Sequence, residues 1–167
     1  MKKLITLLTF ALTIYSHSQS SWHPHFRAGV NTSTVNNSFE FTELNFTIRR
    51  MFNYNYGLQV NFSQSMTEDL TYFKTAVQFV WKFEDRTDFD FLLSAGIAHL
   101  KNGDFSDQPS IKNNAVTGII TGDILFNLDE RHAIGLYGEF IPGLKTLEGD
   151  KTNIYGIGFQ VVVNLFY

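Results

Sequence analysis

The strict alternation of residues 153–167, at the end of the 167-residue chain, constrains the fold more than any other feature. In an extended strand, every second side chain lies on the same face. One face of this segment is apolar or aromatic and consists of Tyr155, Ile157, Phe159, Val161, Val163, Leu165 and Tyr167. The other face is mostly small or uncharged and polar and consists of Gly156, Gly158, Gln160, Val162 and Asn164. The segment therefore predicts a β-strand that separates an apolar environment from a largely polar one.

The N-terminus has the three parts of a secretory signal peptide, in the expected order. Positively charged residues precede an apolar run, which ends in the small residues Ser16 and Ser18. The run is too short to cross a bilayer as a helix, which needs about 20 apolar residues. We therefore predict a signal peptide at residues 1–18, although cleavage after Ser20 fits too, and a single domain at residues 19–167.

Between these two segments the chain repeats strand-like runs of alternating residues, separated by polar connections. We predict eight strands, at residues 26–31, 39–49, 56–63, 72–83, 89–99, 115–128, 133–141 and 153–167. A change of parity predicts a β-bulge near Thr42 and Glu43, and Pro142-Gly143 is expected to end the seventh strand. The connections after the second, fourth and sixth strands are short, whereas those after the fifth and seventh are longer. This pattern predicts an all-β fold, an eight-stranded antiparallel up-and-down transmembrane β-barrel.

Strand length and the position of aromatic residues favour a membrane location. Ten residues at about 3.3 Å each, tilted by about 45°, rise roughly 23 Å, which matches an apolar band of about 25 Å. Rings near one end of the strands are Phe26, Phe46, Tyr56, Phe79, Trp81, Phe83, Phe89, Phe91, Phe126 and Tyr167, and those near the other end are Phe62, Tyr72, Phe73, Phe140 and Tyr155. Two aromatic belts are typical of the two interfaces of a bilayer.

The signal peptide, the strand number, the asymmetry of the turns and the aromatic last residue together resemble the small OmpA/OmpX-type outer-membrane β-barrels. The residues that resemble the C-terminal insertion signature of such proteins are Phe159, Val161, Val163, Leu165 and Tyr167. The resemblance implies a monomer in the outer membrane of a Gram-negative bacterium, in contact with lipid and inserted by the barrel-assembly machinery. It also implies that loops at residues 101–114 and 144–152 face outward, where they could contact an extracellular ligand or a surface partner.

The charged residues that this register directs inward are Arg27, Arg49, Lys74, Lys82, Asp90, Asp123 and Glu139. The lumen of an eight-stranded barrel is only wide enough to be filled by side chains, so buried charges there need partners. We predict that Arg27, Arg49 and Lys82 pair with Asp90 and Asp123 in a structural polar network. A gated ion path along the same residues is the functional alternative.

No group of residues indicates enzymatic chemistry, a metal or a cofactor. His99 and Ser94 lie on opposite faces of one predicted strand, so they cannot form a nucleophile–base pair. His23 and His25 offer only two metal ligands and are expected in a tail before the barrel. The chain has no cysteine, and its net charge of −3 without a basic patch argues against nucleic acid as a partner.

A secreted, lipocalin-like barrel that holds an apolar ligand is the main alternative, because the same alternation turned inside out would surround a cavity with apolar side chains. The outer face would then carry unusually few Lys and Glu residues for a soluble protein. The two alternatives differ in which face of the strands contacts water. In the membrane barrel Phe79 and Phe159 lie on the outside and Gln78 on the inside.

Overall fold

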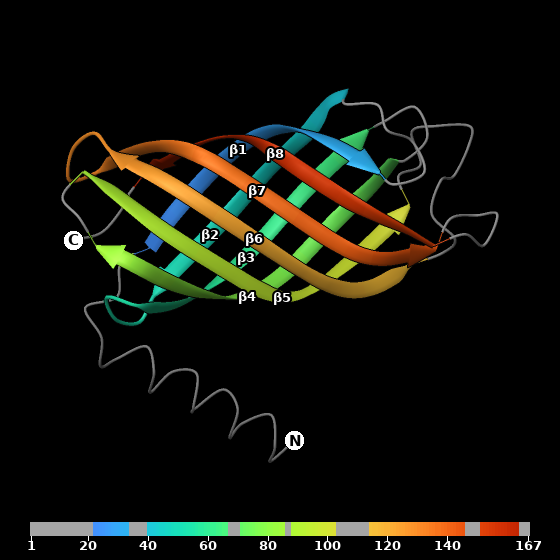
Figure 1. Cartoon of the computed structure of the whole chain (residues 1–167), viewed down its shortest axis with the longest axis horizontal. Helices are drawn as coiled ribbons and strands as arrows, with labels where there is room; N and C mark the ends of the chain where they lie inside the picture. Colours follow the sequence, from blue (N-terminus) through green and yellow to red (C-terminus); the bar gives the residue numbers. More distant parts are fainter. Residues whose placement is uncertain are drawn as a thin grey trace, which may run out of the picture.

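The computed structural model describes residues 22–33, 40–66, 71–85, 88–102, 114–145 and 151–163. They form eight antiparallel strands in a closed barrel, in which each strand pairs with its neighbours in sequence and the first pairs with the last (Figure 1). The strands are β1 (Trp22–Ser33), β2 (Glu40–Met51), β3 (Tyr56–Met66), β4 (Thr71–Asp85), β5 (Phe89–Asn102), β6 (Ala115–Asn127), β7 (His132–Lys145) and β8 (Lys151–Val163). The predicted all-β, eight-stranded up-and-down barrel is confirmed.

Strands β1, β3, β4, β5 and β7 extend further than predicted, because main-chain pairing continues into polar sequence, whereas β6 ends one residue earlier than predicted. In β1 the ladder begins at Trp22, which is paired with Arg50. The prediction that His23 and His25 belong to a tail was therefore wrong, since both lie within the ladder of β1 and β2. No helix long and apolar enough to cross a bilayer occurs among the described residues.

Alternation along each strand separates an apolar exterior from a mostly polar interior. On β8, Phe159 is 73% exposed and the next residue, Gln160, is 2% exposed. On β4, Phe79 is 49% exposed and Gln78 only 1%. Inward positions on β2 and β3 carry Asn45, Thr47, Arg49, Gln59, Asn61 and Ser63, all of which are buried. The predicted register of the two faces is confirmed for these strands.

Bulges interrupt this register where the sequence pattern changes. Gly29 is paired with Glu43 and Val30 with Phe41, so Thr42 is the extra residue of β2, as predicted. A second bulge lies near Phe83, because Lys82 pairs with Leu92 and Glu84 with Phe91.

The third bulge corrects the prediction that Pro142-Gly143 ends the seventh strand. Ile141 pairs with Ile154 and Leu144 with Thr152, so Pro142 and Gly143 together lie opposite Asn153. Gly143 has a φ of 70°, a conformation that favours glycine. Its backbone N–H donates to Asn153 Oδ1 at 2.9 Å. Proline fits at a bulge because no ladder hydrogen bond requires its missing N–H.

The β2–β3 and β6–β7 turns are short and lie at the same end of the barrel, which we call the tight-turn end. In the β6–β7 turn, Asp129 Oδ1 accepts hydrogen bonds from the backbone N–H groups of Arg131 at 2.7 Å and His132 at 2.8 Å. The His132 side chain, followed by the Arg131 N–H, lowers the pKa of the Asp129 carboxyl. The carboxylate thus satisfies turn N–H groups that no strand partner reaches.

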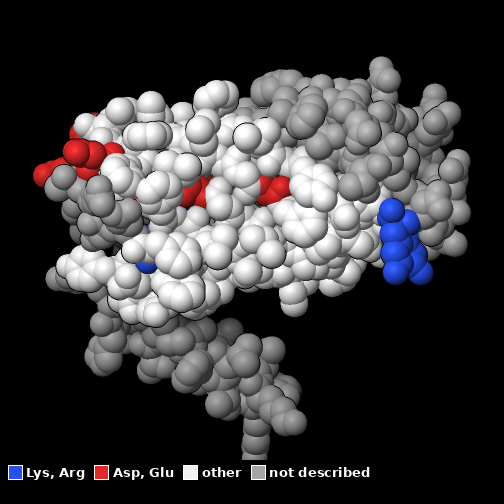
Figure 2. All heavy atoms as spheres, viewed as in Figure 1, with Lys and Arg blue, Asp and Glu red and all other residues white. Residues whose placement is uncertain are grey.

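The exterior carries an apolar band with aromatic rings near both of its edges. Ring centroids near the tight-turn end are 5.8 Å apart for Tyr56 and Phe79 and 4.8 Å apart for Trp81 and Phe83. Toward the other end, Phe140 and Tyr155 are 5.1 Å apart. Figure 2 shows acidic residues gathered at one end, lysine or arginine at the other, and between them a mostly uncharged surface in which two small acidic spots are visible.

Candidate functional site: a filled polar lumen

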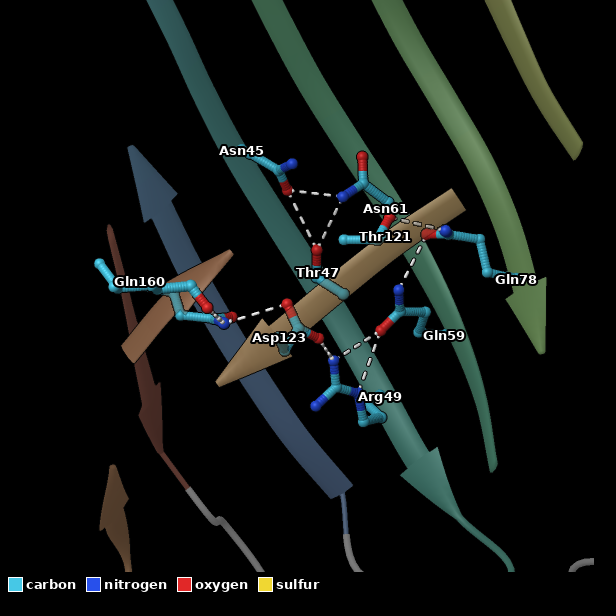
Figure 3. Close-up of polar contacts among 10 residues, drawn as sticks. Asn45, Thr47, Arg49, Gln59, Asn61, Gln78, Thr121, Asp123 and Gln160 are labelled. Atoms are coloured by element: carbon cyan, nitrogen blue, oxygen red, sulfur yellow. Dashed lines mark hydrogen bonds and ion pairs between the residues drawn. The ribbon is translucent and has the colours of Figure 1, made fainter. Parts of the chain in front are cut away.

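An ion pair spans the lumen between β2 and β6. Arg49 Nη2 contacts Asp123 Oδ2, and both side chains are buried. Arg49 also donates through Nε and Nη2 to Gln59 Oε1, at 3.0 and 2.8 Å. The other carboxylate oxygen of Asp123 accepts from Gln160 Nε2 at 3.0 Å. Both charges are therefore compensated by an ion partner and by neutral amides, as a buried pair requires (Figure 3).

Amide side chains extend this network around the barrel. Gln59 Nε2 donates to Gln78 Oε1 at 2.8 Å, and Gln78 Nε2 donates to Thr121 Oγ1 at 2.8 Å. The chain from Arg49 to Thr121 thus links β2, β3, β4 and β6 (Figure 3). Each glutamine uses its carbonyl as an acceptor and its amino group as a donor, which fixes the direction of the whole chain.

A smaller group of hydrogen bonds lies beside this chain on β2 and β3. Asn61 Nδ2 donates to Asn45 Oδ1 at 2.7 Å and to Thr47 Oγ1 at 2.9 Å. Thr47 Oγ1 in turn donates to Asn45 Oδ1 at 3.0 Å. These uncharged residues fill the inner faces of two neighbouring strands without adding a charge that would need a counter-ion.

A second charged cluster contains one lysine and two glutamates. Lys74 Nζ on β4 lies 2.8 Å from Glu43 Oε1 on β2 and also contacts Glu139 Oε1 on β7. All three side chains are completely or almost completely buried. Lys74 and Glu139 were expected to face inward. Glu43 was missed, because the predicted bulge lies near Thr42 and Glu43 and leaves the face of Glu43 undefined.

Of the other predicted lumen residues, Lys82 and Asp90 have side chains that the structure describes, and Arg27 does not. Lys82 Nζ lies 2.9 Å from Asp90 Oδ1 at the tight-turn end, where both side chains are partly exposed. The backbone of Arg27 on β1 pairs with Asn45 and with Gln160, whose own side chains face inward. The Arg27 side chain lies outside the described residues, so its predicted ion pair stays a prediction.

An apolar layer lies between the Arg49 network and the tight-turn end. Four of its members lie two residues beyond a network residue on the same strand, which places them one level closer to that end. These pairs are Val80 after Gln78, Leu125 after Asp123, Val162 after Gln160 and Met51 after Arg49. Leu92 and Ala133 complete the cluster. The described side chains thus close this end with hydrocarbon.

A second apolar cluster fills the half of the barrel away from the tight turns, along β4 to β8. It consists of Tyr72, Ala76, Ala98, Leu100, Ile119, Ile141, Leu144 and Ile154. The prediction that Tyr72 belongs to an aromatic belt was wrong, because its side chain is fully buried. The described lumen is therefore packed in levels of different polarity, with the Arg49–Asp123 pair between the two apolar clusters and the Lys82–Asp90 pair at the tight-turn end. The described interior holds no cluster of three or more His, Cys, Asp or Glu residues that could bind a metal ion.

Those of the remaining predicted residues that the structure describes lie on the faces that the alternation predicts. Ser94 is buried in the lumen and His99 is exposed on the outer wall, so the two side chains do not meet. Within the proposed insertion signature, Phe159 and Val161 are exposed on the outer wall and Val163 is half-buried. Leu165 and Tyr167 lie outside the described residues.

No family model and no curated protein sequence matches the chain. Solved protein structures, in contrast, do match the chain. Neisserial surface protein A superimposes with a TM-score of 0.69 and 9% identity over 89% of this chain and 98% of that one. The fold is that of the small outer-membrane β-barrels. This likeness confirms the predicted OmpA/OmpX-type architecture.

Two further outer-membrane barrels have the same architecture. The N-terminal β-barrel domain of Pseudomonas aeruginosa OprF matches with a TM-score of 0.58 and 14% identity, over 87% of this chain and 98% of that one. The outer-membrane protein AlkL, whose structure was solved in lipid bilayers, matches with a TM-score of 0.58 and 9% identity, over 91% of this chain and 93% of that one. At these identities the likeness concerns the barrel and not the activity of any one protein.

Proposed function

We propose that the chain is a monomeric, integral outer-membrane protein of a Gram-negative bacterium. Its closed barrel anchors a structural or interacting surface at the cell envelope. The observation that carries this proposal is the inverted polarity of the barrel. Large apolar side chains such as Phe79, Ile97 and Phe159 are exposed, while Arg49, Lys74 and Asp123 are buried. A continuous apolar exterior is unstable in water but suits hydrocarbon.

The lipocalin-like alternative needs the opposite arrangement, with polar residues outside and an apolar cavity inside. The described side chains contradict it, since the outward faces carry Phe, Ile, Leu and Val and the lumen contains ion pairs. A soluble carrier of an apolar ligand is therefore the wrong interpretation of the alternation.

Single-cysteine labelling in lipid vesicles tests the membrane proposal. We expect a cysteine at Phe79→Cys to react with a lipid-phase maleimide, because this side chain is on the outer wall within the apolar band. The neighbouring Gln78→Cys is the matched control and should remain unlabelled, because it points into the filled lumen. Equal labelling of both positions by a water-soluble reagent would contradict a membrane-embedded wall.

The packed lumen supports a barrel that does not conduct ions. In planar bilayers we expect the wild-type protein to give no current above background, because ion pairs and apolar side chains occupy the described interior. A large porin recorded under the same conditions provides the positive control. Reproducible single-channel steps that disappear in the variant Arg49→Ala would instead support the ion-path alternative.

The outward loops are the proposed sites of interaction, because binding residues concentrate on loops held by a rigid scaffold. Of the segments 101–114 and 144–152, the structure describes residues 101–102, 114, 144–145 and 151–152, and all of these except residue 114 belong to strands β5, β7 and β8. The proposed signal peptide at residues 1–18 also lies outside the described residues. Recognition of the C-terminal strand by the barrel-assembly machinery belongs to the same proposal.

A further inference from the structure

We propose that the rim of the barrel formed by β7 and β8 binds the phosphate of an anionic lipid headgroup through Lys145 and Lys151. This inference rests on the proposed membrane function and adds a ligand to it. The two lysines lie directly opposite each other at the end of the β7–β8 ladder, and both are exposed. They are at the end of the barrel away from the tight turns.

The bulge at Pro142-Gly143 creates this lysine pair. Along β7 the even-numbered residues Ile134 to Phe140 face outward, so uninterrupted alternation would send Leu144 out and Lys145 in. The extra residue reverses the parity, because Leu144 is 1% exposed and Lys145 is exposed. Bulges commonly re-aim a side chain in this way. Here the result is a second ammonium group beside Lys151.

Two like charges directly opposite each other on neighbouring strands destabilise a sheet. No ion pair with Lys145 or Lys151 occurs among the side chains that the structure describes. An anion bound between the two ammonium groups would remove their mutual repulsion. It would also be attracted electrostatically to both of them. A phosphate has the charge and the several acceptor oxygens that two lysines can share.

The height of the pair on the barrel identifies the source of that phosphate as lipid. Lys151 lies four residues beyond Tyr155, whose ring packs on Phe140 at the edge of the apolar band. Four residues span about 13 Å of strand, or roughly 9 Å of height at the usual tilt. Headgroups extend about 5–8 Å beyond the hydrocarbon on each side. Lysine stems that lie back along the wall therefore bring the ammonium groups to phosphate level.

Native mass spectrometry of the full chain, folded in detergent, tests the site with phosphatidylglycerol, phosphatidylcholine and inorganic phosphate as separate probes. We expect phosphatidylglycerol to bind more tightly than phosphatidylcholine by roughly fivefold for each lysine. The double variant Lys145→Gln/Lys151→Gln should lose this preference. Lys101→Gln is the matched control, since Lys101 is exposed at the same end but has Phe73 opposite it, and it should bind as the wild type does.

The unfolding temperature in detergent without anionic lipid separates binding from a structural role. The double variant should be at least as stable as the wild type, because it removes a repulsion. Loss of stability would overturn the proposal, as would an unchanged lipid preference in the double variant or equal binding of inorganic phosphate. The loop between the lysines contains Glu148 and Asp150, and the variant Glu148→Gln/Asp150→Asn should keep the preference. Failure of the proposed membrane function would appear separately, as the absence of lipid-phase labelling at Phe79→Cys.

Discussion

Replacing Lys74 with methionine should lower the free energy of unfolding by about 3–5 kcal/mol, or prevent the barrel from folding. Lys74 is the cation shared by Glu43 and Glu139, and all three side chains are removed from water. Methionine keeps much of the volume but leaves two carboxylates near each other in the lumen without this cation. The measurement is the urea dependence of folding into lipid vesicles, followed by the gel mobility of unheated samples.

Lys82→Met is the matched control for this experiment. Lys82 also pairs with a carboxylate, Asp90, but both side chains are partly exposed at the tight-turn end. Partly solvated ion pairs contribute about 0–1 kcal/mol, so this variant should unfold near the wild-type urea concentration. The triple variant Lys74→Met/Glu43→Gln/Glu139→Gln should regain most of the lost stability. If Lys74→Met and Lys82→Met lowered the free energy of unfolding equally, burial of the ion pair would not determine the effect.

The second large effect is expected for Gly135→Ala on β7. A Cβ at this position would lie 2.0 Å from the backbone oxygen of Ile124 on β6. Backbone in a closed ladder cannot move aside as a flexible side chain would, so the two strands must separate locally. We expect a loss of about 1–3 kcal/mol or more, as for other overpacked positions. Gly96→Ala should behave similarly, because its Cβ would meet the backbone oxygen of Val77 at 2.0 Å.

Gly122→Ala provides the control for the glycine experiment. Gly122 faces the outer wall of β6, where an added Cβ would meet no atom within 4 Å. Alanine there removes only unfolded-state freedom and adds apolar surface, so stability should stay the same or rise slightly. Both variants are compared by the same urea titration in vesicles. If Gly122→Ala lowered the free energy of unfolding as much as Gly135→Ala, the close contact between strands would not be the cause of the destabilisation.

The faces of most described side chains away from the bulges could be predicted from the sequence because a strand has a period of two. Phe79 and Gln78 differ by one position, and this difference alone determines which one faces the lumen. The bulge at Thr42 was also visible, since the apolar residues change parity there. Strand number followed from the same alternation and from the spacing of polar connections.

Contacts across the lumen could not be predicted in the same way. Alternation gives the direction of a side chain but not its height, which depends on the stagger of strands around the barrel. Gln78 was expected to face inward, yet nothing in the sequence indicates that Gln59 donates a hydrogen bond to it. Glu43 was missed because it adjoins a bulge, and Pro142-Gly143 was misjudged because a bulge and a strand end share the same residue types.

The seam between β1 and β8 has a consequence for biogenesis. Nine residue pairs, from His25 with Val162 to Ser33 with Ile154, join the earliest strand of the barrel to the latest one. Until β8 arrives, the free borders of β1 and β7 expose main-chain N–H and C=O groups that hydrocarbon cannot solvate. A truncated or stalled chain is therefore unstable in lipid as an open sheet with unpaired edge strands. Every main-chain border is paired only when β8 has joined both β7 and β1.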